Sequence, residues 1–262
     1  MTNPDVPLRF ELAVEVPGTP EQVWDAIATA NGISSWMMPT ELEGRQGGAV
    51  VFHMGPEASS EGTVTRWDPP HRLVYEEPNW AALAGQDPAT VTPLVSEFVV
   101  EARSGGTCVV RVVSSAFGSG ADWEREFFDD MSAGWTPMFD NLVLYLTHFP
   151  GQRVSSLEAS VDTPASPADA ASGIRRALGV DDVGQSIDLR SGKAVVERFA
   201  GESLVLRLTD PVPGLLGFYA FRSGEDTSSV RLAGYLFSDD APSYVEREQA
   251  RWQAWLDALD LK

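Results

Sequence analysis

Apolar and polar residues alternate at the start of the chain. Between Arg9 and Val16 every second residue is apolar, and this period predicts a half-buried strand. The segment Thr19-Pro20-Glu21-Gln22 then supplies a capping residue, a proline at the first helical position and a glutamine that completes a capping box. We expect this helix to end at Asn31-Gly32, and a short second helix or turn over Ile33–Met38 to carry Trp36.

Five further segments have the length and pattern of strands, at residues 49–54, 62–67, 72–76, 94–102 and 107–114. Turn-rich breaks such as Asp68-Pro69-Pro70 separate most of them, which favours an antiparallel meander. The connection from Pro78 to Pro93 is longer, and we expect it to fold over one end of the sheet. From Asp122 to Phe149 large apolar residues recur every three or four positions, which predicts a long amphipathic helix. The predicted order is β-α-β-β-β-β-β-α.

The same series of predicted elements begins again after Pro150-Gly151. A constant offset of 147 residues takes Pro20 to Pro167 and Ile27 to Ile174. Later strands are expected at residues 185–189, 193–199, 203–208, 217–221 and 230–237, with a closing helix at 244–259. The closing helices match at an offset of only 117, which takes Trp135 to Trp252, so the second copy is shorter by about thirty residues. We therefore expect two tandem α+β domains, at residues 1–150 and 151–262.

Composition and charge exclude several partners. The 262 residues carry a formal net charge of −19, which repels a phosphate backbone and an anionic membrane surface, so we expect neither nucleic acid nor a membrane as a partner. The single cysteine, Cys108, allows no intramolecular disulfide. No secretion signal and no apolar run of membrane-spanning length occurs. These features predict a cytoplasmic protein.

Several motifs of the first domain resemble a known family. They are Val23-Trp24-Asp25-Ala26-Ile27 with Trp36 after it, Gly62-Thr63-Val64, the segment Asp68-Pro69-Pro70-His71-Arg72-Leu73, and Gly134-Trp135 in the closing helix. Together they resemble activator-of-Hsp90-ATPase-like domains of the START-like (SRPBCC) superfamily over roughly residues 8–149. The second domain matches through topology alone.

The resemblance implies a helix-grip fold, in which a curved antiparallel sheet wraps a long C-terminal helix and leaves an apolar cavity. Members of the superfamily bind apolar small molecules, and a minority catalyse cyclisation or hydration. The side chains that we expect to line the cavity, with Trp80 as a lid residue, are Trp36, Phe52, His53, Met54, Tyr75, Trp80, Phe98, Phe127, Met131, Trp135 and Phe139. The alternative for each is that it only fills the core.

No sequence pattern indicates catalysis or a metal. His53, His71 and His148 lie far apart and form no metal-binding spacing, so we predict no metal, no cofactor and no assigned catalytic residue. The ring of His53 could nevertheless face the cavity as a hydrogen-bonding or acid/base group.

Three hypotheses follow. The first is a non-enzymatic carrier or sensor of a small apolar molecule. The second is an enzyme of the polyketide-cyclase kind that uses Tyr75 or His53 in the same pocket. The third is a protein-interaction or cochaperone-like module, with a homodimer or a protein partner left open.

Overall fold

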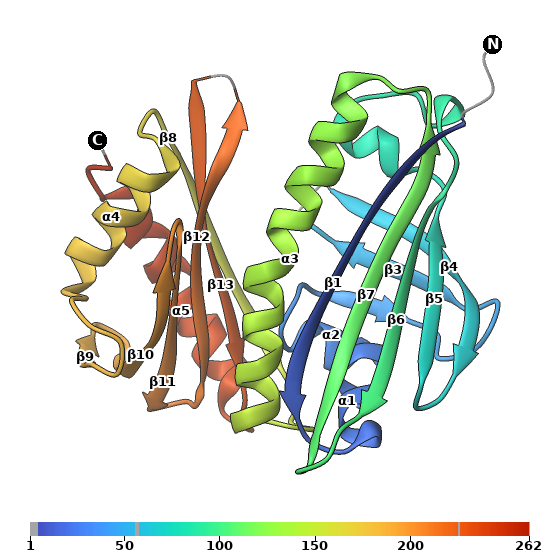
Figure 1. Ribbon diagram of the computed structural model, residues 1–262. Coiled ribbons are helices and arrows are strands. Elements are labelled where there is room, and N and C mark those ends of the chain that lie inside the picture. Colours follow the sequence, from blue (N-terminus) through green and yellow to red (C-terminus); the bar gives the residue numbers. More distant parts are fainter. Residues whose placement is uncertain (1–4, 56–57, 225, 262) are drawn as a thin grey trace. The chain divides into compact units, whose positions relative to one another are not determined.

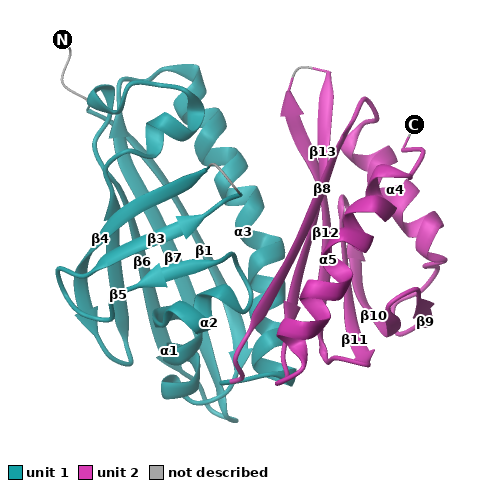
Figure 2. Cartoon of the chain, turned by 180° about the vertical axis from the view of Figure 1, so that it is seen from behind, with its two compact units in different colours: residues 1–151 teal, residues 152–262 magenta. Residues whose placement is uncertain are grey.

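The chain divides into two compact units, Met1–Gly151 (unit 1) and Gln152–Lys262 (unit 2), drawn in different colours in Figure 2. The computed structural model describes residues 5–55, 58–224 and 226–261. Within these residues, no helix combines the length and the apolar composition that crossing a bilayer requires.

Unit 1 is a seven-stranded antiparallel sheet with helices on one face (Figure 1). In chain order its elements are β1 (Val6–Pro17), α1 (Pro20–Ala28), α2 (Ala30–Ser34), β2 (Thr40–Leu42), β3 (Ala49–His53), β4 (Ser59–Asp68), β5 (Arg72–Glu77), the short 3-10 helices η1 (Trp80–Ala84) and η2 (Pro88–Thr90), β6 (Leu94–Ala102), β7 (Thr107–Gly118) and α3 (Asp122–His148). The strand order is β1-β7-β6-β5-β4-β3-β2, so the first strand pairs with the last.

Unit 2 repeats this plan with six strands. Its elements are β8 (Ser155–Thr163), α4 (Pro167–Leu178), β9 (Ser186–Leu189), β10 (Gly192–Ala200), β11 (Ser203–Asp210), β12 (Gly214–Gly224), β13 (Thr227–Leu236) and α5 (Ala241–Asp257). The strand order β8-β13-β12-β11-β10-β9 again joins the first strand to the last. Both units are therefore α+β helix-grip folds in tandem, and the second is the shorter one, as the sequence predicted.

The repeat is visible in the helix starts. Thr19 caps α1 and Ser166 caps α4, each through its side-chain oxygen, and each cap is followed by a proline. The proline has no backbone N–H to leave unsatisfied in the first turn, and its φ already suits a helix. The strand–cap–helix series identified in the sequence is thus the beginning of each unit.

Two local expectations need correction. The strand β2 was not predicted, because a three-residue strand is too short to show a period of its own. The second short helix is α2, which starts at Ala30 and ends at Ser34, because Thr29 accepts a hydrogen bond from the Gly32 N–H and starts a new helix there. Trp36 therefore lies just after this helix, and its indole N–H donates to the Ala26 carbonyl oxygen at 2.9 Å.

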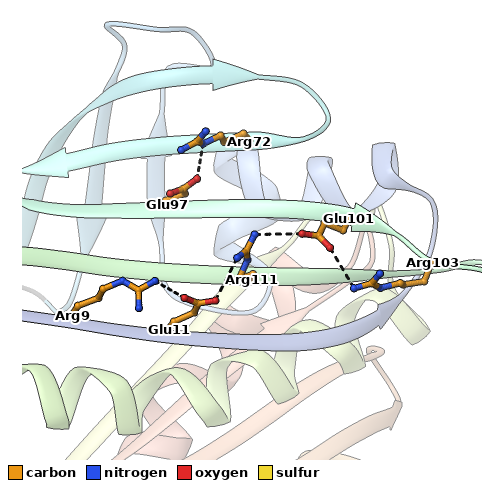
Figure 3. A network of polar contacts seen from close by, with 7 residues as sticks. All are labelled: Arg9, Glu11, Arg72, Glu97, Glu101, Arg103 and Arg111. Carbon is orange, nitrogen blue, oxygen red and sulfur yellow. Dashed lines mark hydrogen bonds and ion pairs between the residues drawn. The ribbon is translucent and has the colours of Figure 1, made fainter.

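The outer face of the unit 1 sheet is covered by charged side chains (Figure 3). Arg111 on β7 contacts Glu11 on β1 at 3.4 Å and Glu101 on β6 at 3.3 Å. The hydrogen bond from Arg9 is the main cause that lowers the pKa of Glu11. These pairs are solvent-exposed and stabilise the fold only slightly, so they mark the face that water covers. Apolar side chains gather on the opposite, inner face.

Candidate functional site

Six aromatic side chains form one cluster on the inner face of unit 1, called here the central aromatic cluster. They come from the segment after α2, from three strands and from α3: Trp36, Phe52, Tyr75, Phe98, Trp135 and Phe139. All six are buried, and their rings contact one another in a chain. Centroid separations run from 5.3 Å for Phe52 and Tyr75 to 6.4 Å for Trp36 and Phe139. The structure brings together these six of the side chains expected to line a cavity.

A second aromatic group packs around Trp80 at the start of the connection between β5 and β6. Its neighbours on α3 are Phe127 at 4.9 Å and Phe128 at 5.7 Å between ring centroids, and Met131 packs against the same group. The Trp80 indole N–H donates to the Thr92 carbonyl oxygen at 2.9 Å, which holds the connection closed on itself. Trp80 is fully buried in this position.

Polar side chains also lie on the inner face, among the aromatic rings. Ser96 on β6 and Ser114 on β7 are buried neighbours, with 3.0 Å between their hydroxyl oxygens. Tyr75 is the β5 partner of Ser96 in the sheet. Two residues further along β5, the buried Glu77 accepts a hydrogen bond from the Ser60 hydroxyl on β4. A line of polar groups therefore crosses the interior of unit 1.

Glu77 differs from the other two buried glutamates among the described residues. Glu124 at the start of α3 accepts from the backbone N–H groups of Ser119, Gly120 and Ala121 and from the Ser119 hydroxyl, at 2.8 to 3.1 Å. Glu248 on α5 accepts from two guanidinium groups, those of Arg247 and Arg251, at 2.9 Å each. Glu77 has the single hydroxyl of Ser60 and no ion pair with any described residue.

These surroundings set the protonation of the interior. Burial raises the pKa of the Glu77 carboxyl to about 7, and the hydrogen bond from Ser60 only partly offsets that effect. Burial also raises the pKa of the Tyr75 hydroxyl, and the nearby Glu77 charge adds to it. Tyr75 therefore stays neutral, whereas Glu77 can hold or release a proton close to neutral pH. Such a group can act as a hydrogen-bond donor, as an acceptor or as an acid/base.

A glycine on β4 makes room for the Glu77 side chain. A Cβ atom on Gly62 would lie 3.1 Å from Glu77 Cγ and 2.6 Å from the Glu76 carbonyl oxygen. The second distance is shorter than real Cβ contacts, so the close approach of β4 and β5 here requires glycine. Gly62 belongs to one of the motifs on which the family resemblance rests.

The expectation for His53 is corrected by its position. Phe52 points inward to Tyr75, and the next residue of a strand points to the opposite face. The His53 side chain is accordingly 42% exposed, and its Nε2 lies 3.1 Å from Glu41 Oε1. His53 therefore does not belong to the interior site. Met54 is half-buried just beyond the end of β3, and its backbone N–H donates to the Ala58 carbonyl oxygen.

The sequence reasoning missed Glu77, Ser60, Ser96 and Ser114. A signal was present in the alternation, because Leu73, Tyr75 and Glu77 share one face of β5 and are buried together. Likewise Ser96 lies between Leu94 and Phe98 on the inner face of β6. A glutamate at a strand end is normally assigned to solvent, which hid the signal. Among the described residues, no group of three or more His, Cys, Asp or Glu side chains is arranged to hold a metal ion.

A helix-grip domain with a largely aromatic interior is the class that this fold and site define. The sequence model of one family, described as Activator of Hsp90 ATPase homolog 1-like protein, matches residues 17–147, which is half of the chain. The chain belongs to this family, and the matched residues lie within unit 1.

Known relatives add little about function. Uncharacterized protein MT1597 of Mycobacterium tuberculosis (strain CDC 1551 / Oshkosh) is 32% identical over 73 residues, which are 24% of this chain and 51% of the relative. Uncharacterized protein Rv1546 of the H37Rv strain matches with the same values. The chain spans about half the length of the curated relatives it matches.

Similar solved structures include the Aha1 dimer from Colwellia psychrerythraea, at 18% identity and a TM-score of 0.43, covering 53% of this chain and 96% of the other. Another is the di-domain ARO/CYC BexL from the BE-7585A biosynthetic pathway, at 12% identity and a TM-score of 0.45, covering 97% and 99%. At such scores these likenesses carry no conclusion about what this chain binds.

Proposed function

We propose that unit 1 binds a small, largely apolar molecule that carries a hydroxyl or carbonyl group, and that Glu77 and Tyr75 hold this group. The observation that supports the proposal is that the Glu77 carboxyl is buried with one hydroxyl partner and has a raised pKa. A buried carboxyl with one hydroxyl partner costs folding stability, and costly perturbed groups of this kind concentrate at functional sites.

The proposed binding residues are the central aromatic cluster around the polar line, with Phe127, Met131 and Trp80 at one end and Met54 beyond β3. Aromatic rings supply apolar contact area, and the carboxyl and the phenol supply direction. Because these rings already contact one another, the ligand has to displace side chains as it enters.

The test compares wild type with Glu77→Gln and Glu76→Gln. Glu76 precedes Glu77 on the same strand and points to the opposite face, so its variant is a matched control. Native mass spectrometry of the freshly purified chain should detect a bound apolar molecule. In a thermal-shift panel of fatty acids and polyphenols, Glu77→Gln should bind at least about fivefold more weakly, while Glu76→Gln binds as wild type. Binding that is absent in wild type, or equal in all three proteins, would refute the proposal.

A second function has a specific observation in its favour. A carboxyl whose pKa is about 7 is matched to proton transfer at neutral pH, as an enzyme of the polyketide-cyclase kind requires. In such a reaction Glu77 would take a proton from a carbon next to a carbonyl group. That carbon would bond to a second carbonyl carbon of the same molecule, and Glu77 would return the proton to the oxygen of that carbonyl. The resulting hydroxyl would leave as water with a second proton from the nucleophilic carbon, which forms a carbon–carbon double bond. Incubation with a poly-β-ketone thioester tests this, because a cyclised, dehydrated product should form with wild type and not with Glu77→Gln.

A further inference from the structure

Unit 2 contains a pocket of its own. Its volume is about 390 Å³, within the range of roughly 300–1,000 Å³ that is typical of small-molecule sites. The end of α4, the turn between β9 and β10, and one side of α5 line it. In Figures 1 and 2 the two helices lie on the same side of the unit 2 sheet. The pocket is thus framed by the helices of this unit.

Two indole rings form a rigid corner of the pocket. Trp252 and Trp255 lie with ring centroids 5.4 Å apart and ring planes at 86°. Phe218, buried on β12, contacts both rings edge-on at 5.9 and 6.0 Å, which fixes their orientation. Leu178 and Leu189 add apolar surface. A corner of this shape can stack one face of a planar ring on one indole and receive its edge on the other.

Among the described residues, some of the charged side chains around the pocket form ion pairs and others do not. Glu248 is already neutralised by Arg247 and Arg251. Asp188 and Arg190 also line the pocket, and in the described part of the chain Arg190 forms no ion pair. A guanidinium group without a carboxylate partner is available to an anionic or hydrogen-bond-accepting group. Asp188 adds a negative charge to the same lining, which favours a ligand with a single anionic group.

We propose that this pocket binds a planar aromatic molecule with a single anionic substituent, which stacks on Trp255, meets the largely buried Trp252 with its edge and pairs with Arg190. The proposal is independent of the function proposed for unit 1, since no residue is shared. With a net charge of −19, the chain as a whole repels anions, so an anion that binds does so at a specific site.

Anthraquinone-2-sulfonate is a suitable probe, and isothermal titration calorimetry on the full chain measures its binding. We expect a dissociation constant of about 0.1 mM or tighter for a probe of this size. Cyclohexanesulfonate, an anion without a planar ring, should not bind. Arg190→Gln should weaken binding of the probe about fivefold, the upper range for an exposed ion pair. Lys193→Gln removes an equal charge from an exposed residue outside the pocket and should have no effect.

Two further variants locate the probe. Trp255→Leu should weaken binding at least as much as Arg190→Gln, with thermal melting used to confirm that the variant is folded. Glu76→Gln should leave binding unchanged, because Glu76 belongs to unit 1 and points away from its interior. Absence of binding, equal weakening in Arg190→Gln and Lys193→Gln, or weakening in Glu76→Gln would each overturn the proposal.

Discussion

Gly62 on β4 lies against Glu77 on β5 so closely that a Cβ atom would stand 3.1 Å from Glu77 Cγ. The same Cβ would stand 2.6 Å from the Glu76 carbonyl oxygen, a backbone atom that cannot rotate away. We expect Gly62→Ala to lower the free energy of unfolding by about 1–3 kcal/mol, as overpacking does. Urea denaturation measures this.

Gly134 is the matched control for that substitution. It lies inside α3, and a Cβ atom there would meet nothing within 4 Å. Gly134→Ala should raise the free energy of unfolding by about 0.5–1 kcal/mol, because alanine loses less backbone entropy in a helix. If both glycine variants changed stability in the same direction, the close packing of β4 on Glu77 would not be the cause.

The Glu77 carboxyl should make stability depend on pH. In the unfolded chain it loses its proton near pH 4.5, whereas in the folded chain it keeps the proton up to about pH 7. Between these values the folded state binds more protons, so the contribution of Glu77 to stability falls as pH rises. The loss over the whole window is roughly 3 kcal/mol. The unfolding free energy of wild type minus that of Glu77→Gln should therefore decrease from pH 4.5 to pH 8. A constant difference would show that Glu77 does not titrate in this window.

Glu124 should show the opposite pH dependence. Burial opposes its charge, but the hydrogen bonds from Ser119, Gly120 and Ala121 outweigh burial and lower the pKa of Glu124 below its ordinary value. Its stabilising contribution is therefore complete above that ordinary value and is lost as pH falls through the lower, folded value. At pH 7, Glu124→Gln should cost about 1–3 kcal/mol for a buried N–H left without an acceptor. In acid the gap to wild type should narrow, and denaturation at pH 7 and pH 3 would measure it.

The fold followed from the sequence because apolar side chains repeat with the period of each element. The alternation from Leu94 to Val100 gives β6 and the three-and-four spacing from Trp123 to Tyr145 gives α3, since each pattern buries one face. The site was less predictable. The alternation of Leu73, Tyr75 and Glu77 indicates the face of Glu77, but a charged side chain is normally assigned to water. Its hydrogen-bond partner Ser60 comes from the neighbouring strand β4, through sheet pairing that local pattern does not encode. His53 was placed inside together with Phe52, although neighbouring residues of a strand face opposite sides.

Because His53 points away from the interior, its replacement should leave ligand binding unchanged. His53→Ala removes an exposed contact with Glu41, which is worth about 0–1 kcal/mol. Because the ring lies outside the central aromatic cluster, the variant should bind every molecule that shifts the melting temperature of wild type with equal affinity. A loss of binding in the thermal-shift panel would show that His53 takes part in binding.

Each of the two helix caps should stabilise the start of the first helix in its own unit. Thr19 and Ser166 occupy equivalent positions 147 residues apart, and each accepts from a backbone N–H in the first turn, at 3.4 Å from Gln22 and 3.2 Å from Asp169. Replacing either by alanine should cost about 0.5–2 kcal/mol, because one donor of the helix start is left unsatisfied. Glycine at the same positions should cost only a few tenths of a kcal/mol, because water can reach the donor. Hydrogen exchange of the α1 and α4 amides would separate the effects: Thr19→Ala should loosen α1 alone and Ser166→Ala should loosen α4 alone. If either alanine variant left its own helix as protected as in wild type, that cap would not be what starts the helix.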